Sequence, residues 1–179
     1  MKLYKSLAFV VSALIVPGAF AASTYAGEQS REIKALSDEE VESLLAGKGM
    51  GFAKAAELNG FAGPSHVLEL ADELQLTAEQ RTRTAALFAS MSANAMASGR
   101  MLVAKEQELD QLFATSAVSA RQLASTLREI GVLQAQVREA HLQAHLAQVE
   151  ILTPEQNARY GVLRGYGKAT EQATHKHRH

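Results

Sequence analysis

The 179-residue chain contains no cysteine and no tryptophan, and aromatic residues make up only 6% of it. Without disulfides, packing or association with another subunit must hold the fold together. The shortage of bulky aromatic side chains and the abundance of alanine favour thin helices over a sheet with a bulky core.

Signatures of common enzyme classes are also missing. The sequence has no glycine-rich phosphate loop, no His-Glu-x-x-His motif and no Ser/His/Asp arrangement with a local signature. Ser65 precedes His66, but a helix start explains the serine better than catalysis does. We therefore expect a protein that binds rather than catalyses, without an organic cofactor.

The N-terminus has the order of a secretory signal peptide. Lys2 and Lys5 precede an apolar run over 7–16, and Ala19-Phe20-Ala21 resembles a cleavage site. We expect residues 1–21 to be removed, with an alternative cut after Ala26, and the mature chain to lie in the periplasm. An uncleaved membrane anchor is the other interpretation, but the run is short for a span of about 20 residues.

Charge excludes one class of partner. Loss of Lys2 and Lys5 leaves 16 basic and 19 acidic residues. Nucleic-acid-binding proteins usually carry a concentrated basic face, so we expect no nucleic-acid partner. No later stretch is apolar enough for a membrane span.

The remaining pattern is helical. Residues 22–46 read as a flexible lead with a short helix, which Ser37 and Glu40 begin as a capping box. Two turns over 52–58 and a helix from Ser65 to about Gln75 follow.

Two long helices come next, over 78–114 and about 119–151. Apolar residues recur in the first at three- and four-residue steps. In the second, steps of four and three residues alternate strictly along a coiled-coil-like seam from Leu123 to Ile151. We expect these helices to form a long antiparallel hairpin, with shorter helices beside it. A last helix runs to about Arg164, and Gly99 weakens the first long helix and marks a bend.

One pentapeptide pattern occurs twice, at helix starts. Leu76-Thr77-Ala78-Glu79-Gln80 and Leu152-Thr153-Pro154-Glu155-Gln156 lie 76 residues apart. In each, threonine can cap the new helix while glutamine reaches back to the cap residue.

With the signal peptide and the hairpin, these repeats resemble the LTxxQ group of periplasmic proteins, which includes Spy/CpxP stress chaperones, zinc-resistance-associated proteins and heavy-metal sensors. The likeness covers residues 47–167. The stretches Gly49–Gly51, Ala55–Gly60 and Leu163–Tyr166 are similar to a subgroup labelled as periplasmic metal sensors or Spy/CpxP-like proteins.

The resemblance implies an all-α, non-enzymatic, dimeric protein. Its chaperone branch binds unfolded clients, and its metal branch binds zinc, nickel, cobalt or copper. This chain departs from the sensor pattern, which has a paired His-x-x-x-His in its first helix and a glutamate early in the next. Here the first of these helices has only His66, and the next has Arg83 and Thr84.

Three histidines and a methionine form a candidate metal site. His141 and His145 lie four apart, on one helix face. If the hairpin turns near residue 116, His145 faces Leu87 and His141 faces Met91, and His66 comes to the same level. Imidazole suits zinc, copper and nickel, with Met91 as a soft fourth ligand. The alternative is structural or solvated histidines and a methionine that fills the core.

Weaker candidates lie elsewhere. The tail 168–179 reads as disordered, and its His175, His177 and His179 either bind metal weakly or stay solvated beside cations. Glu106 needs a partner, and Lys105 or Arg128 is predicted to pair with it at the rim. Apolar residues in the glycine-rich segment and along the first long helix suit a dimer or client surface, or ordinary packing; they are Met50, Phe52, Leu58, Phe61, Met91, Met96 and Met101.

The leading hypothesis is therefore a periplasmic, homodimeric transition-metal-binding or metal-sensing protein of stress or metal resistance. The alternative is an ATP-independent Spy/CpxP-like chaperone for unfolded proteins. A third interpretation is a small partner of an envelope sensor protein.

Overall fold

The computed structural model describes residues 23–166, so the expected signal peptide over 1–21 and the histidines of the tail lie outside the described residues. The chain divides into two compact units. The first ends at Ser30 and contains the short 3-10 helix Glu28–Ser30. The second begins at Arg31 and contains all six α-helices of the described chain.

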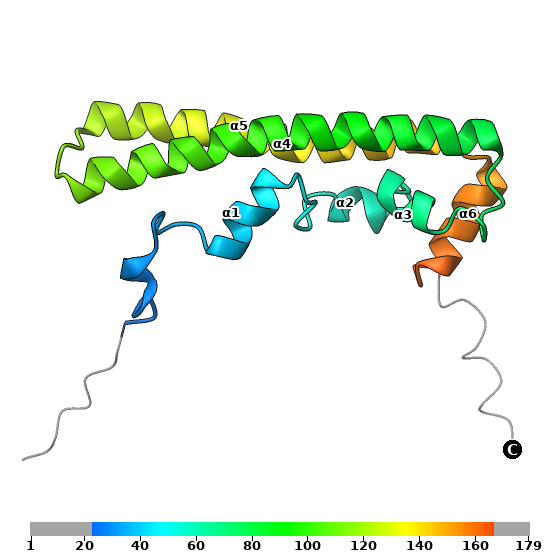
Figure 1. The fold of residues 1–179 in the computed structure, drawn as a ribbon, viewed down its shortest axis with the longest axis horizontal. Helices are drawn as coiled ribbons and strands as arrows, with labels where there is room; N and C mark the ends of the chain where they lie inside the picture. The colour runs from blue at the N-terminus through cyan, green and yellow to red at the C-terminus, as the bar shows by residue number, and fades with distance from the viewer. Residues whose placement is uncertain (1–22, 167–179) are drawn as a thin grey trace, which may run out of the picture. The chain divides into compact units, whose positions relative to one another are not determined.

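The long hairpin is confirmed. Helix α4 spans Ala78–Ala114 and helix α5 spans Ala120–Val149, and the two make the most extensive helix contact in the described chain. Figure 1 shows them side by side, joined by a short turn. Ser119 and Gln122 form the capping box that begins α5. No strand occurs within residues 23–166, so the all-α class is also confirmed.

Three short helices lie along one side of the hairpin (Figure 1). They are α1 (Asp38–Leu45), α2 (Lys54–Glu57) and α3 (Pro64–Glu69). Helix α1 packs on α4, α2 on α5, and α3 on both. The predicted start of α3 was wrong, because Gly63 is the N-cap and Pro64 occupies the first turn, where its missing N–H costs nothing. That helix also ends before the predicted Gln75.

The two Leu-Thr-x-x-Gln corners meet in space. Helix α6 (Pro154–Leu163) begins with a capping box from Thr153 and Gln156, as α4 does with Thr77 and Gln80. Each glutamine amide also donates to the other's Oε1, at 2.7 Å and 3.1 Å. Gln80 donates further to the Ile151 carbonyl and Gln156 to that of Leu74. The repeated motif thus closes two helix ends and joins them.

Two apolar clusters stabilise the packing, one at the end of the hairpin where α4 begins and α5 ends, and one nearer its middle, beneath α1. The corner cluster consists of Ala62, Val67, Ala71, Leu74, Leu76, Leu152 and Tyr160. The α1 cluster consists of Leu44, Leu102, Ile130 and Val137. Gly99 lets α1 approach α4 at this point, since a Cβ there would lie 2.2 Å from the Leu44 carbonyl oxygen. Gly99 lies inside the continuous α4, so close helix packing accounts for it.

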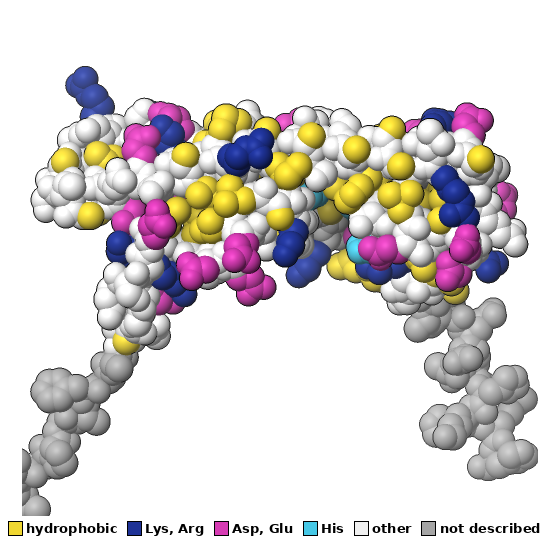
Figure 2. Space-filling view, viewed as in Figure 1, with side chains coloured by type: hydrophobic (Ala, Val, Ile, Leu, Met, Phe, Trp, Pro, Cys, Tyr) yellow, Lys and Arg dark blue, Asp and Glu magenta, His cyan; other side chains and the backbone are white. Residues whose placement is uncertain are grey.

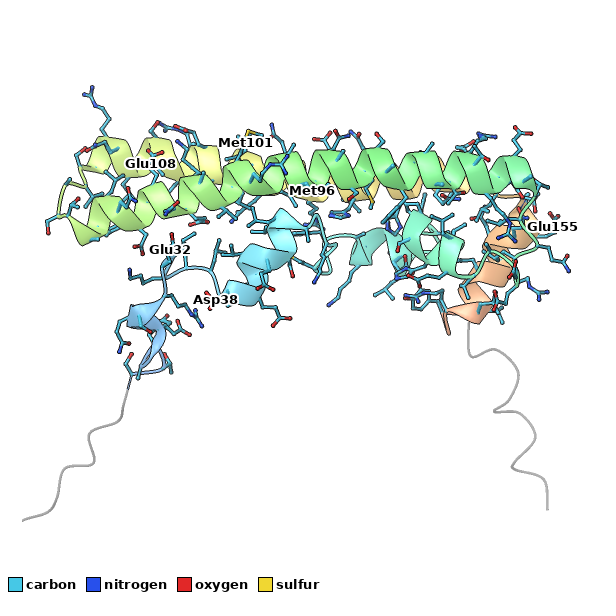
Figure 3. The ribbon with its side chains drawn as sticks, in the orientation of Figure 1. Glu32, Asp38, Met96, Met101, Glu108 and Glu155 are labelled. Carbon is cyan, nitrogen blue, oxygen red and sulfur yellow. The ribbon has the colours of Figure 1, made fainter. Side chains whose placement is uncertain are left out.

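The three methionines of α4 do not share one surface. Met91 is buried, Met96 lies under the segment after α1, and Met101 is exposed. Figure 3 shows Met96 on the side of α4 that faces α1 and Met101 on the opposite side. Among the helices of residues 23–166, none is both long and apolar enough to cross a membrane.

The predicted ion pair of Glu106 was wrong. Lys105 bonds Glu108 at 2.7 Å and Glu129 at 2.8 Å instead. Glu106 lies on the α1 side of α4 beside Leu109 and has no ion pair or hydrogen bond with any of residues 23–166. Burial accordingly raises the pKa of Glu106.

Candidate functional site

The structure brings all four residues of the candidate metal site to one cleft. This cleft, of about 520 Å³, lies between the hairpin and the segment that carries α2 and α3, and it is lined by His66, Met91, His141 and His145. Figure 2 shows histidine side chains in a hollow on this side of the hairpin. The four side chains meet because α5 runs antiparallel to α4, which brings His141 and His145 to the level of Met91, and because α3, which carries His66, packs on both helices.

A buried glutamate lies at the centre of the cleft. Glu57, at the end of α2, is only 8% exposed and is the one carboxylate among the described residues that line the cleft. Its Oε1 accepts a hydrogen bond of 2.5 Å from the Tyr160 hydroxyl and one of 3.3 Å from Arg164 Nε. His66 Nδ1 lies 3.4 Å from the same oxygen. A buried carboxylate is costly without such partners.

Helix α6 supplies two of those partners. Tyr160 is 1% exposed, packs in the corner cluster and accepts a bond from the Gly63 N–H at 3.4 Å. Burial, together with the bond to Glu57, raises the pKa of the Tyr160 hydroxyl, which therefore stays protonated and donates. Arg164 lies one turn further, at the end of the same helix.

His145 approaches the other oxygen of Glu57. Its Nδ1 lies 3.7 Å from Glu57 Oε2 and 2.8 Å from the carbonyl of Phe61. A carbonyl can only accept, so Nδ1 carries a proton and, in the neutral ring, Nε2 keeps its lone pair. Gly63 makes this approach possible, since a Cβ there would lie 3.0 Å from His145 Nε2 and 3.3 Å from Glu57 Oε2.

His141 occupies the neighbouring turn of α5. The ring is 3% exposed and stacks on Phe52, with centroids 6.4 Å apart. Burial, with a smaller contribution from the charge of His145, lowers the pKa of His141, and a hydrogen bond to the Lys48 backbone opposes the shift. The ring is therefore neutral at neutral pH, the form that metals bind.

Three donor atoms of the cleft are left open. Glu57 Oε2 and His141 Nε2 are buried and have no hydrogen-bond partner within the described chain. With His145 Nε2 we call these the open donors. Residues 23–166 nonetheless hold no ready-made group of three His, Asp or Glu side chains around one point. A metal ion would have to draw these side chains together.

Sequence reasoning missed Glu57, Tyr160 and Arg164. Glu57 and Arg164 lie within the stretches Ala55–Gly60 and Leu163–Tyr166 that carry part of the family resemblance, but polar residues in short segments give no periodic signal. Their contacts span 94 to 107 positions of sequence. No family model, no curated protein and no solved structure matches this chain.

Proposed function

We propose that this chain binds a divalent transition-metal ion of the zinc, nickel, cobalt or copper class in the cleft around Glu57. The supporting observation is the set of open donors, because a buried polar atom without a partner is costly and calls for an explanation. Two of the three, Glu57 Oε2 and His141 Nε2, are such atoms. A bound cation would satisfy them.

The donor chemistry fits this class of ion. Imidazole nitrogens with one carboxylate oxygen suit zinc, nickel, cobalt and copper better than magnesium or calcium, which prefer oxygen ligands. Glu57 Oε2 and His145 Nε2 both lie beside Gly63, at 3.3 Å and 3.0 Å from the place of an added Cβ. His141, whose pKa burial lowers, adds another imidazole nitrogen. Met91 is buried beside them and offers a thioether. His66 engages only after its present contacts are broken.

The cellular setting is part of the same proposal. The N-terminal sequence and the LTxxQ resemblance support an exported periplasmic protein that acts in metal resistance or envelope stress. The same resemblance supports a homodimer, and an envelope sensor protein is a candidate partner. The tail histidines His175, His177 and His179 are a second, weaker metal-binding segment.

Isothermal titration of the chain from Ala22 onward with Zn²⁺, Ni²⁺ and Cu²⁺ tests the proposal. We expect one tight site, and about a hundredfold weaker binding when His141 and His145 are both replaced by alanine, since two ligands are lost. The exposed Gln143, between them on α5, gives the control Gln143→Ala. Truncation before Thr174 separates the tail. Equal binding by the double variant and the parent would refute the cleft as the site.

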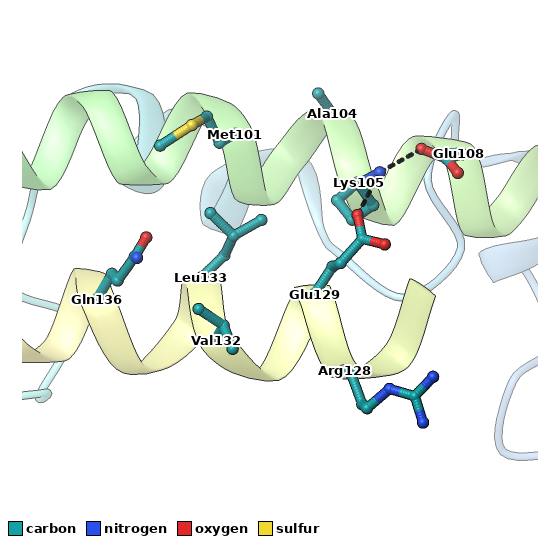
Figure 4. A pocket seen from close by; sticks show the side chains of 9 residues that line it. All are labelled: Met101, Ala104, Lys105, Glu108, Arg128, Glu129, Val132, Leu133 and Gln136. Atoms are coloured by element: carbon teal, nitrogen blue, oxygen red, sulfur yellow. Dashed lines mark hydrogen bonds and ion pairs between the residues drawn. The ribbon is translucent and has the colours of Figure 1, made fainter. Parts of the chain in front are cut away.

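A second function, chaperone activity, is favoured by apolar surface on the hairpin. A groove of about 690 Å³ runs between α4 and α5, lined by Met101, Val132 and Leu133 and edged by Lys105 with its two glutamates (Figure 4). Met101 and Val132 are 51% and 56% exposed. Such a surface suits an unfolded client. Suppression of client aggregation without ATP, lost in Val132→Asp but kept in the metal-site variants, would establish it.

A further inference from the structure

Arg164 already holds two of the groups in the cleft. Its Nε donates to Glu57 Oε1 at 3.3 Å, and its Nη2 lies 3.3 Å from His66 Nε2. A guanidinium has only donors, so His66 Nε2 must accept. The His66 proton then lies on Nδ1, which faces Glu57 Oε1 at 3.4 Å. In this state both nitrogens of His66 are in use.

A metal ion held by the open donors that also recruits His66 would need the atoms that Arg164 contacts, which are His66 Nε2 and Glu57 Oε1. It would bind the same His66 lone pair and would neutralise the same carboxylate, and two cations cannot share one nitrogen lone pair. Repulsion between the guanidinium and a divalent ion at this distance adds to the competition, and the partial burial of Arg164, whose side chain is 29% exposed, weakens its screening by water. Arg164 and a metal ion are therefore competitors for this cleft.

The position of Arg164 links that competition to α6. The Arg164 residue follows the last helical position and precedes Gly165, whose φ of +75° turns the chain. Its guanidinium also lies over the Tyr166 ring, 5.7 Å from the centroid, and donates to the Tyr166 hydroxyl at 3.4 Å. Val162 and Leu163 are exposed, whereas Tyr160 anchors α6 one turn earlier.

We propose that Arg164 is a resident cation that a transition-metal ion displaces, so that metal loading releases Arg164 and Tyr166 from the cleft while Tyr160 keeps α6 in place. The inference rests on the proposed function. The end of α6 is then the segment whose conformation changes when the cleft binds a metal ion, and a partner protein would recognise that change there. The linkage is reciprocal, because any partner that draws Arg164 away must also tighten metal binding.

Substitution of Arg164 tests the competition in the full mature chain with Zn²⁺ as the probe. Arg164→Gln removes the charge and should tighten Zn²⁺ binding about tenfold, within the usual range of coupling between sites. Arg164→Lys keeps a cation and should stay near the parent. Arg159→Gln, at an exposed position on α6, is the matched control and should change nothing.

A nuclear magnetic resonance signal tests the displacement itself. The side-chain N–H peak of Arg164, assigned by its absence in Arg164→Gln, should shift or broaden as Zn²⁺ is added, while the Arg159 peak stays. Two outcomes would overturn this inference and leave the metal site intact. In one, the parent binds Zn²⁺ but the Arg164 peak does not move. In the other, a folded Arg164→Gln chain binds Zn²⁺ as well as the parent or more weakly. Absence of Zn²⁺ binding by the parent would overturn both. Should Arg164→Gln not fold, Arg164→Lys supplies the assignment and the parental peak decides.

Discussion

Two glutamates, each 8% exposed, have opposite surroundings. Glu57 lies on α2, beside the corner half of the hairpin, and Glu106 lies on α4, in the α1 half. Glu57 is held by Tyr160, Arg164 and His66 around one oxygen. Glu106 lies beside apolar groups, and burial raises its pKa. Equal burial therefore has different meanings. Glu57 has polar partners on one oxygen and none on the other, which indicates a candidate binding site. Glu106 is desolvated without any such partner, which only lowers the stability of the fold.

The apolar packing of the two halves differs in the same way. In the α1 half, backbone approaches backbone closely and apolar side chains fill the space. In the corner half, hydrogen bonds of Gln80, Gln156 and Tyr160 run through the apolar cluster. Close apolar packing therefore determines the arrangement of the α1 half, and hydrogen bonds between polar side chains determine that of the corner half.

The largest expected effect breaks the α1 half. Gly99→Ala places a methyl group 2.2 Å from the Leu44 carbonyl oxygen, so we expect a loss of about 3 kcal/mol of unfolding free energy, or detachment of α1. Gly131→Ala on α5 is the control, since nothing lies within 4 Å of its added Cβ. Alanine there should stabilise by up to about 1 kcal/mol. Urea denaturation measures both, and a neutral Gly99→Ala would contradict the packing argument.

The next effect separates the two glutamates. Glu57→Gln leaves Arg164 without its carboxylate and should cost about 2 kcal/mol at pH 7. Glu106→Gln removes a desolvated charge and should instead stabilise the chain by about 1 kcal/mol. Thermal or urea unfolding compares the pair, and destabilisation by both would show that Glu106 has a structural role.

The pH dependence sharpens that contrast. Because burial raises the pKa of Glu106, the folded chain binds its proton more tightly than the unfolded chain. Its contribution to stability is therefore complete below the ordinary pKa of 4.5 and is lost as the pH rises through the folded-state value. Glu106→Gln should remove this component, so the gain in unfolding free energy of the variant over the parent should disappear at acidic pH. An advantage that persists unchanged below pH 4 would contradict this cause.

The smallest effect concerns the two corners. Gln80→Ala and Gln156→Ala each lose cap and cross-corner bonds, at about 1 kcal/mol apiece. A double-mutant cycle should give a coupling of about 0.5–1 kcal/mol. Gln122→Ala removes the matching cap of α5, whose bonds reach only Ser119, and should show no coupling to either. Strict additivity of Gln80→Ala and Gln156→Ala would refute the reciprocal pair.

The candidate site was predictable in part. The spacing of His141 and His145 and the return of the hairpin placed them with Met91 and His66, as the structure does. Glu57, Tyr160 and Arg164 gave no such signal, because each lies in a short segment where neither periodicity nor capping constrains what the side chain meets. Glu106 was misassigned to an ion pair because sequence spacing does not show that Lys105 points to Glu129.

The sequence by itself determined the helices and their ends. Periodic apolar residues, four capping boxes and short turns act within a few positions of the chain, so α1, α4, α5 and α6 begin where local hydrogen bonds require. Only the tertiary structure decided which buried polar groups meet. Those contacts depend on how α2, α3 and α6 pack around the hairpin, and their distances depend on small residues such as Gly63 and Gly99, where an added Cβ would crowd its neighbours.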